Sequence, residues 1–78
     1  MAPIRRITDW EEAGRVVARR IARHSGLTLE EADAGVLSVL GCIREEDVDG
    51  RLVVRNEEGR EIARVPASVL RGIDVPTG

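Results

Sequence analysis

Few side chains in this 78-residue sequence are of the types that carry out catalysis. The chain holds one histidine, His24, and one cysteine, Cys42. Nucleophilic catalysis needs a nucleophile, a base and an orienting group within reach of one another. Cys42 follows the C-terminal end of an expected helix, where the helix dipole disfavours a thiolate. His24 falls on the apolar face of another expected helix, which favours a structural role. The sequence therefore predicts no catalytic residues, and we do not expect an enzyme.

The acidic run at residues 45–49 is the candidate for a metal site. A calcium loop of the EF-hand type needs oxygen ligands at alternate positions. Counted from Asp47, the third position is Asp49, but the fifth is Arg51, which offers no oxygen ligand. A solvated, charged hairpin is the better interpretation, and no metal is expected. The glycines form neither a phosphate loop nor a dinucleotide-binding motif, so no cofactor is expected.

All twelve basic residues are arginine. Arg15, Arg19 and Arg23 recur every four residues and share one face of an expected helix. Such a face can contact a phosphate backbone, which makes a nucleic-acid-binding regulator the alternative function. The net charge of −2 gives this alternative no support, and Glu11 is placed to form an intrahelical ion pair with Arg15. The charge is also divided: residues 1–27 carry six arginines and three acidic residues, and residues 28–78 carry six and eleven.

Two helices must position these side chains. The first is expected from about Asp9 to His24, capped by Thr8 or Asp9 and ended by Gly26. Its apolar face follows helical spacing and consists of Trp10, Ala13, Val17, Ile21 and His24. The second helix begins with a capping box formed by Thr28 and Glu31 and closes at Gly41. Its expected buried stripe consists of Leu29, Ala32, Val36, Val39 and Leu40.

The pattern changes to strands after the second helix. Strands are expected at 42–48, 52–55 and 61–65, with turns at Asp49-Gly50 and at 56–59. Pro66 at a first helical position predicts a short final turn of helix. The expected fold class is α+β: a two-helix pair, then a three-stranded antiparallel meander, then a short C-terminal helical turn. We expect a single small domain over 1–78, with loose ends at 1–7 and 73–78.

The size of the chain favours self-association. A domain this short buries only about 60% of the surface of its unfolded chain, so it usually needs a staple or a partner. One cysteine allows no internal disulfide. The start of the sequence lacks a signal peptide's apolar stretch, and the longest uncharged run, 34–43, is too short to span a bilayer. A cytoplasmic location is therefore expected.

These observations favour a non-enzymatic protein-interaction module as the leading hypothesis. Such a module would be a homodimeric regulator, adaptor or assembly factor. Its partner would be another protein or a second copy of itself, and neither a membrane nor a small-molecule substrate is expected. The edges of the expected sheet offer one pairing surface.

Two segments resemble the HU/IHF family of bacterial histone-like proteins. Residues 21–34 are similar to that family's link between its first two helices, and residues 55–68 to the returning arm of its β-ribbon and the following strand. The resemblance implies an intertwined dimer that grips DNA, with Arg55, Arg60 and Arg64 near the DNA backbone. The chain lacks the family's Gly-Phe-Gly turn, and its arm is acidic where the family's arms are basic. The resemblance covers about half of the chain, and we do not assign the protein to this family.

Overall fold

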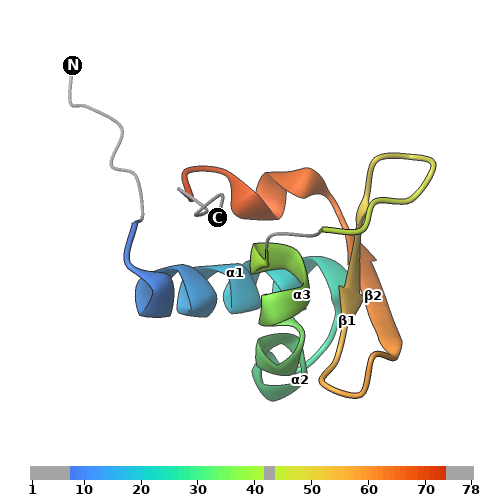
Figure 1. The fold of residues 1–78 in the computed structure, drawn as a ribbon. Helices are drawn as coiled ribbons and strands as arrows, with labels where there is room; N and C mark the ends of the chain where they lie inside the picture. Colours follow the sequence, from blue (N-terminus) through green and yellow to red (C-terminus); the bar gives the residue numbers. More distant parts are fainter. Residues whose placement is uncertain (1–7, 42–43, 74–78) are drawn as a thin grey trace.

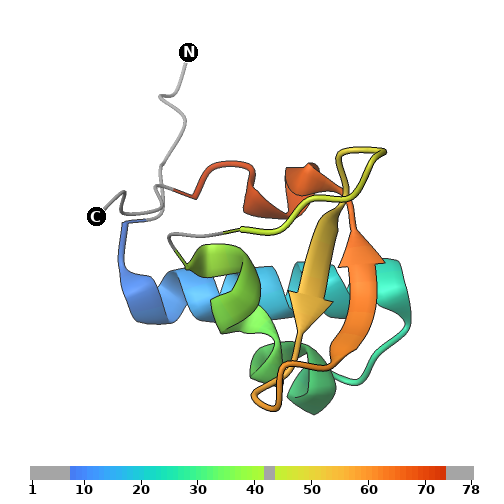
Figure 2. The same ribbon diagram turned by 45° about the vertical axis from the view of Figure 1, so that its right-hand side comes forward.

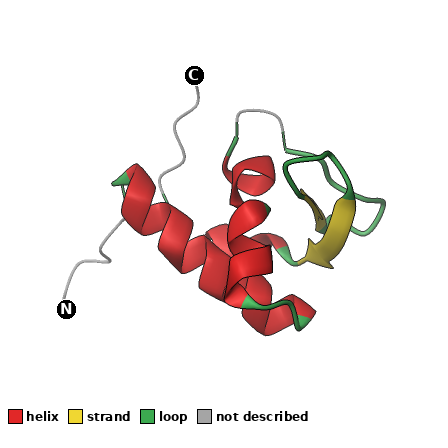
Figure 3. Ribbon diagram, turned by 90° about the horizontal axis from the view of Figure 1, so that it is seen from below, coloured by secondary structure: helices red, strands yellow, loops and turns green. Residues whose placement is uncertain are grey.

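The computed structural model describes residues 8–41 and 44–73, and these form a small α+β domain with helices followed by an antiparallel sheet (Figure 1). The elements in chain order are α1 (Trp10–Ser25), α2 (Leu29–Ala34), α3 (Val36–Leu40), β1 (Leu52–Arg55), β2 (Glu61–Val65) and the 3-10 turn η1 (Ala67–Leu70). Seen from below, the helices gather on one side and the two strands on the other (Figure 3). The predicted order of helices before strands is therefore confirmed.

The longest helix, α1, begins and ends close to where the sequence predicts. Asp9 is its N-cap, and Glu11 and Glu12 lie at the positive end of the helix dipole. At the other end Gly26 adopts the left-handed conformation with φ of 77°, and its N–H donates to the carbonyl oxygen of Ala22 at 2.9 Å. Glycine populates this region without the steric cost of a Cβ atom, which explains the stop.

The buried face of α1 is shorter than the sequence predicts. Its buried residues lie between Ala13 and Ile21. Trp10 and His24, expected on the same apolar face, are exposed. A 16-residue helix is about 24 Å long, and the elements packed against it cover only its middle turns. The expectations of a buried Trp10 and of a structural His24 on the apolar face are therefore wrong.

The predicted second helix is broken at Gly35 into α2 and α3. The expected capping box is present: the Thr28 hydroxyl accepts from the Glu31 N–H at 3.1 Å, and Glu31 Oε1 accepts from the Thr28 N–H at 3.0 Å. A Cβ atom at Gly35 would clash with Val54 Cγ1 and lie 3.2 Å from Ile62 Cδ1. The chain turns at Gly35 because the hairpin approaches the backbone there, and α3 then packs on β1.

The two strands pair antiparallel, with Leu52 opposite Val65 and Val54 opposite Ala63. The register shifts between Val54 and Arg55, which marks a β-bulge. At this irregular point the Arg55 N–H donates to the hydroxyl of Ser38 in α3 at 3.0 Å, and that hydroxyl donates to the Gly35 carbonyl oxygen at 2.8 Å. A side chain of α3 therefore accepts the N–H of the last residue of β1.

The predicted third strand at 42–48 is not confirmed. Residues 42 and 43 lie outside the described part, and Glu46 forms only an isolated bridge with Leu52. The last residue of the expected strand, Val48, is fully exposed in the turn. This turn spans Asp47 to Gly50, whereas the sequence analysis expected a tight turn at Asp49-Gly50 alone.

The two turns on either side of β1 have the same construction. In each, an Asp47 or Asn56 side-chain oxygen accepts the N–H groups two and four residues further along, all at 2.9 to 3.0 Å. In each, a glycine with positive φ occupies the fourth position, Gly50 at 80° and Gly59 at 81°. The common pattern is Asx-x-x-Gly-Arg, and the side-chain bonds hold both turns locally.

The core lies between the helices and the inner face of the hairpin (Figure 2). The largest fully buried side chains are Ile21, Leu40, Leu52, Val17, Val39, Val54, Val65 and Val69. The predicted stripe of the second helix is confirmed except for Leu29, which is exposed. The short final helical turn is confirmed as η1, with Pro66 as its N-cap. It packs against α1 and contributes Val69 to the core.

The close approach at Gly35 can be tested with a matched pair of glycine variants. Gly35→Ala should lower the free energy of unfolding by about 1–3 kcal/mol, because the new methyl group overpacks the contact with Val54. Gly14→Ala places its Cβ atom at an ordinary 3.8 Å from Val36 Cγ1, so it should raise stability by up to about 1 kcal/mol through helix propensity. Urea unfolding of both variants measures the difference. Equal effects at the two sites would show that no close backbone approach limits residue size at Gly35.

The start of α2 yields a second prediction. Thr28→Ala removes the acceptor for the Glu31 N–H and should destabilise the protein by about 1 kcal/mol. Thr28→Ser keeps the hydroxyl and should stay close to the unsubstituted protein. Thermal or urea unfolding followed by circular dichroism gives both values. A Thr28→Ala protein as stable as the Ser variant would show that the cap contributes nothing.

Candidate interaction surfaces

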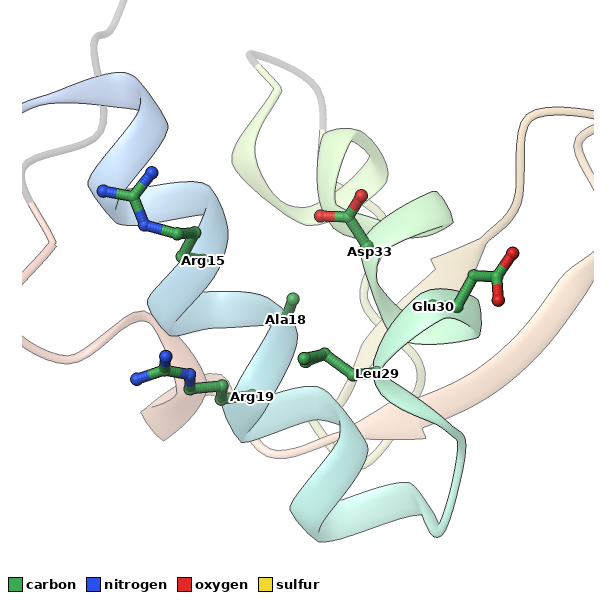
Figure 4. Close-up of a pocket in the computed structure, with 6 residues that line it drawn as sticks. All are labelled: Arg15, Ala18, Arg19, Leu29, Glu30 and Asp33. Atoms are coloured by element: carbon green, nitrogen blue, oxygen red, sulfur yellow. The ribbon is translucent and has the colours of Figure 1, made fainter.

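A hollow of about 370 Å³ lies between α1 and α2 (Figure 4). Ala18 of α1 and Leu29 of α2 face each other and form its apolar floor. Arg15 and Arg19 extend from the side of α1 that faces away from α2. Glu30 and Asp33 come from α2 on the opposite side. The hollow is therefore apolar at its centre, basic along one flank and acidic along the other.

A second hollow of about 380 Å³ adjoins the first and shares Arg15 and Asp33 with it. It adds Trp10, Glu11, Gly14, Val36, Leu37 and Glu57 to the lining. We call the two together the helical groove. Three large apolar side chains of this groove are exposed to solvent: Trp10 at 44%, Leu29 at 53% and Leu37 at 65%. Exposed apolar side chains gathered on one surface typically mark a binding site.

The three arginines singled out from the sequence are exposed, as a solvent-facing stripe requires. None of them forms an ion pair within residues 8–41 and 44–73, and the expected Glu11–Arg15 pair is absent there. No single hollow among the described residues is lined by all three. Each step of four residues advances about 40° beyond a full helical turn, so the stripe winds around α1. Arg15 and Arg19 border the helical groove, whereas Arg23 lies toward η1.

On its η1 side, α1 borders a third hollow of about 330 Å³, lined by Arg20, Arg23, His24, Ser68 and Arg71. We call it the basic hollow. Arg20 links α1 to the segment that contains η1, because its Nη1 donates to the carbonyl oxygens of Val69 at 3.0 Å and Arg71 at 2.7 Å. Sequence reasoning missed Arg20 and Arg71. Arg20 breaks the four-residue spacing, and Arg71 comes close only through the fold.

Ion pairs cover the outer face of the hairpin. Arg55 binds Glu45 through two hydrogen bonds of 2.8 and 3.2 Å. Arg64 binds Glu61 through two bonds of 3.1 Å and reaches Asp47 Oδ2 at 3.4 Å. Two of the three arginines that the HU/IHF resemblance places near DNA are therefore paired with carboxylates.

The same face buries an apolar side chain. Val53 is only 4% exposed although it lies outside the main core cluster. Arg64 lies directly opposite Val53 on β2. The Val53 N–H donates to the Glu45 carbonyl oxygen at 2.9 Å. The paired arginines thus act as a cover for Val53, because arginine stems can lie along apolar surface while their heads stay in water.

Hydrogen bonds lower the pKa of three carboxylates in the domain. The backbone N–H of Thr28 lowers the pKa of Glu31, and the Arg55 side chain lowers that of Glu45. For Asp47 the largest cause is the hydrogen bond from the Arg51 backbone N–H, with Asp49 and Arg64 adding to it. Each of these bonds favours the charged carboxylate.

The described residues offer neither a metal site nor a membrane-spanning helix. In the described part of the chain, no three His, Cys, Asp or Glu side chains lie close enough together to hold a metal ion. None of the helices described is long and apolar enough to cross a bilayer. Cys42 lies outside the described residues, so the structure does not bear on the prediction made for it.

No protein-family model, curated protein or solved structure matches this chain. The function must therefore be inferred from the surfaces described above.

The hydrogen bonds of Asp47 predict how stability depends on pH. Its pKa is lowered in the folded state, so the stability that it adds is present above its ordinary pKa of about 4 and is lost as the pH falls through the lowered folded value. Asp47→Asn retains the turn's hydrogen bonds, as Asn56 does in the second turn. The urea midpoint of this variant should therefore fall less on acidification from about pH 6 to about pH 3 than that of the unsubstituted protein.

Asp49→Asn provides the control for this comparison. The Asp49 carboxylate lies in the same turn but makes no hydrogen bond or ion pair with any described residue. Its removal should leave the acid dependence unchanged. If the urea midpoints of both variants depended on pH in the same way, the hydrogen bonds to Asp47 would not be the cause of the acid destabilisation.

Proposed function

We propose that this protein is a non-enzymatic protein-interaction module that acts in the cytoplasm as a homodimeric regulator, adaptor or assembly factor. The observation that carries the proposal is the helical groove, with three exposed apolar side chains between flanks of opposite charge. Among the described residues that line the groove there is no histidine or cysteine. Apolar side chains, guanidinium groups and exposed carboxylates suit binding better than proton transfer or nucleophilic attack.

The occupant that this groove fits best is a second copy of the same chain. In a two-fold symmetric dimer the same patch meets itself, so each residue on one flank contacts a residue on the other flank of the partner. Arg15 and Arg19 on α1 would then approach Asp33 and Glu30 on the partner's α2. The two flanks form no ion pair with each other within one chain, which leaves both available for this contact.

The groove also has the residue types that anchor protein interfaces. Tryptophan and arginine are enriched among the side chains whose removal costs most binding energy. Trp10 and Arg15 both line the second hollow, next to the exposed Leu37. Burial of this apolar surface between two copies would also supply stability that a domain of this size lacks.

The hairpin edge is a weaker candidate for self-association. β2 has only five residues, and Glu61 and Arg64 on it are paired with each other. Short, charged edge strands are typical of sheets protected against pairing. We therefore place the dimer contact on the helices.

Charge reversal across the groove tests this proposal. Arg19→Glu and Asp33→Arg should each weaken dimerisation by about tenfold or more, because each places like charges opposite one another. An equimolar mixture of the two variants should recover association, since both symmetry-related contacts of the heterodimer join opposite charges. Sedimentation velocity over a concentration series measures each dissociation constant.

Arg60→Glu serves as the matched control, because Arg60 is an exposed arginine in the hairpin turn and lies outside the groove. It should leave the dimer unchanged. A protein that sediments as a monomer at high micromolar concentration would contradict the proposal. So would a dimer that neither groove variant weakens.

A further inference from the structure

The basic hollow is a second surface that the proposed dimer does not use. Its lining comes from two parts of the chain: Arg20, Arg23 and His24 from the last turns of α1, and Ser68 and Arg71 from η1 and the residue after it. Among the described residues, no Asp or Glu lines it. We propose that this hollow binds the phosphodiester backbone of a nucleic acid.

Arg20 gives the hollow a defined shape. Both bonds of its Nη1 go to backbone carbonyl oxygens at the end of η1, at 3.0 and 2.7 Å. These bonds hold the backbone of Arg71 against α1, although the two residues are 51 positions apart. Arg20 is therefore a positioning residue. Its Nε and Nη2 groups make no bond to any described residue and remain as donors.

The other cations of the hollow are free to bind an anion. Arg23 and Arg71 are exposed and form no ion pair within the described residues. The Ser68 hydroxyl makes no hydrogen bond there either. Guanidinium groups and a hydroxyl are the donors that most often contact phosphate oxygens in nucleic-acid complexes. Arginine's planar fork also matches phosphate geometry.

The extent of the basic surface favours a polymer over a single small anion. A smaller hollow of about 180 Å³, lined by Val16, Arg19, Arg20 and Arg23, continues the basic surface along α1. The two hollows share Arg20 and Arg23, so the cations extend from Arg71 along α1 and do not surround a single pocket. A linear row of cations suits successive phosphates, which release their counterions on binding.

A membrane surface fits this region less well. A helix that lies on a bilayer inserts an apolar face beside its basic residues. The apolar face of α1 is buried in the core at Val17 and Ile21. The large exposed apolar side chains of the described residues are Trp10, Leu29, Leu37 and Val48, and none of them lines the basic hollow.

Fluorescence anisotropy tests the proposal with labelled duplex DNA and single-stranded DNA of about 20 nucleotides. Binding should be detectable near 50 mM salt and should weaken steeply toward 200 mM. In the Arg23→Gln/Arg71→Gln double variant, the slope of log K against log salt should become shallower by about 2, because two phosphate contacts are lost. Neither residue lines the helical groove, so this result is independent of dimerisation.

Arg51→Gln/Arg60→Gln is the control, because it removes the same charge from the two hairpin turns. It should leave affinity and salt slope unchanged, and circular dichroism should show that both double variants are folded. No binding near 50 mM salt would overturn the proposal. Equal loss in the two double variants would overturn it too, because net charge alone would then explain binding. Retention on anionic phospholipid vesicles without binding to either DNA would assign the hollow to a membrane surface instead.

Discussion

The missing side chain at Gly35 allows the helical half of the chain to meet the hairpin. Val54 and Ile62 occupy the space that a Cβ atom would need. The turn at this point directs α3 onto β1, where the Ser38 hydroxyl bonds both Gly35 and Arg55, the last residue of β1. It also leaves α2 beside α1 as the second wall of the helical groove. Shape, core and candidate surface therefore all depend on one close backbone approach.

Local signals in the sequence were sufficient wherever the structure is held by neighbouring residues. The capping box at Thr28, the stop at Gly26 and the two strands at 52–55 and 61–65 are confirmed. Helical spacing identified which face of α1 is apolar. It could not indicate how far along the helix its partners reach, so Trp10 and His24 were assigned to a core that does not extend to them. The same limit applies to Gly35, because its role is set by Val54, nineteen positions later.

The candidate surfaces were less predictable than the fold. The sequence identified Arg15, Arg19 and Arg23 as exposed, but treated them as one stripe. The helix winds them from the groove on one side toward η1 on the other. Arg71 enters the basic hollow only because η1 folds back over α1 and Arg20 fixes it there. Contacts between residues about 50 positions apart leave no local pattern, whereas the repeated Asx-x-x-Gly-Arg turns could have been recognised from the printed sequence.

The two proposed surfaces share α1 but occupy different flanks of it. Burial of the helical groove between two copies leaves Arg23, Ser68 and Arg71 uncovered, because none of them lines the groove. A dimer would then present two basic hollows. Linked sites bind far more tightly than either site alone when both can engage one ligand. A chain of net charge −2 could thus hold a polyanion through two local concentrations of arginine, and dimerisation would strengthen that binding without any new contact.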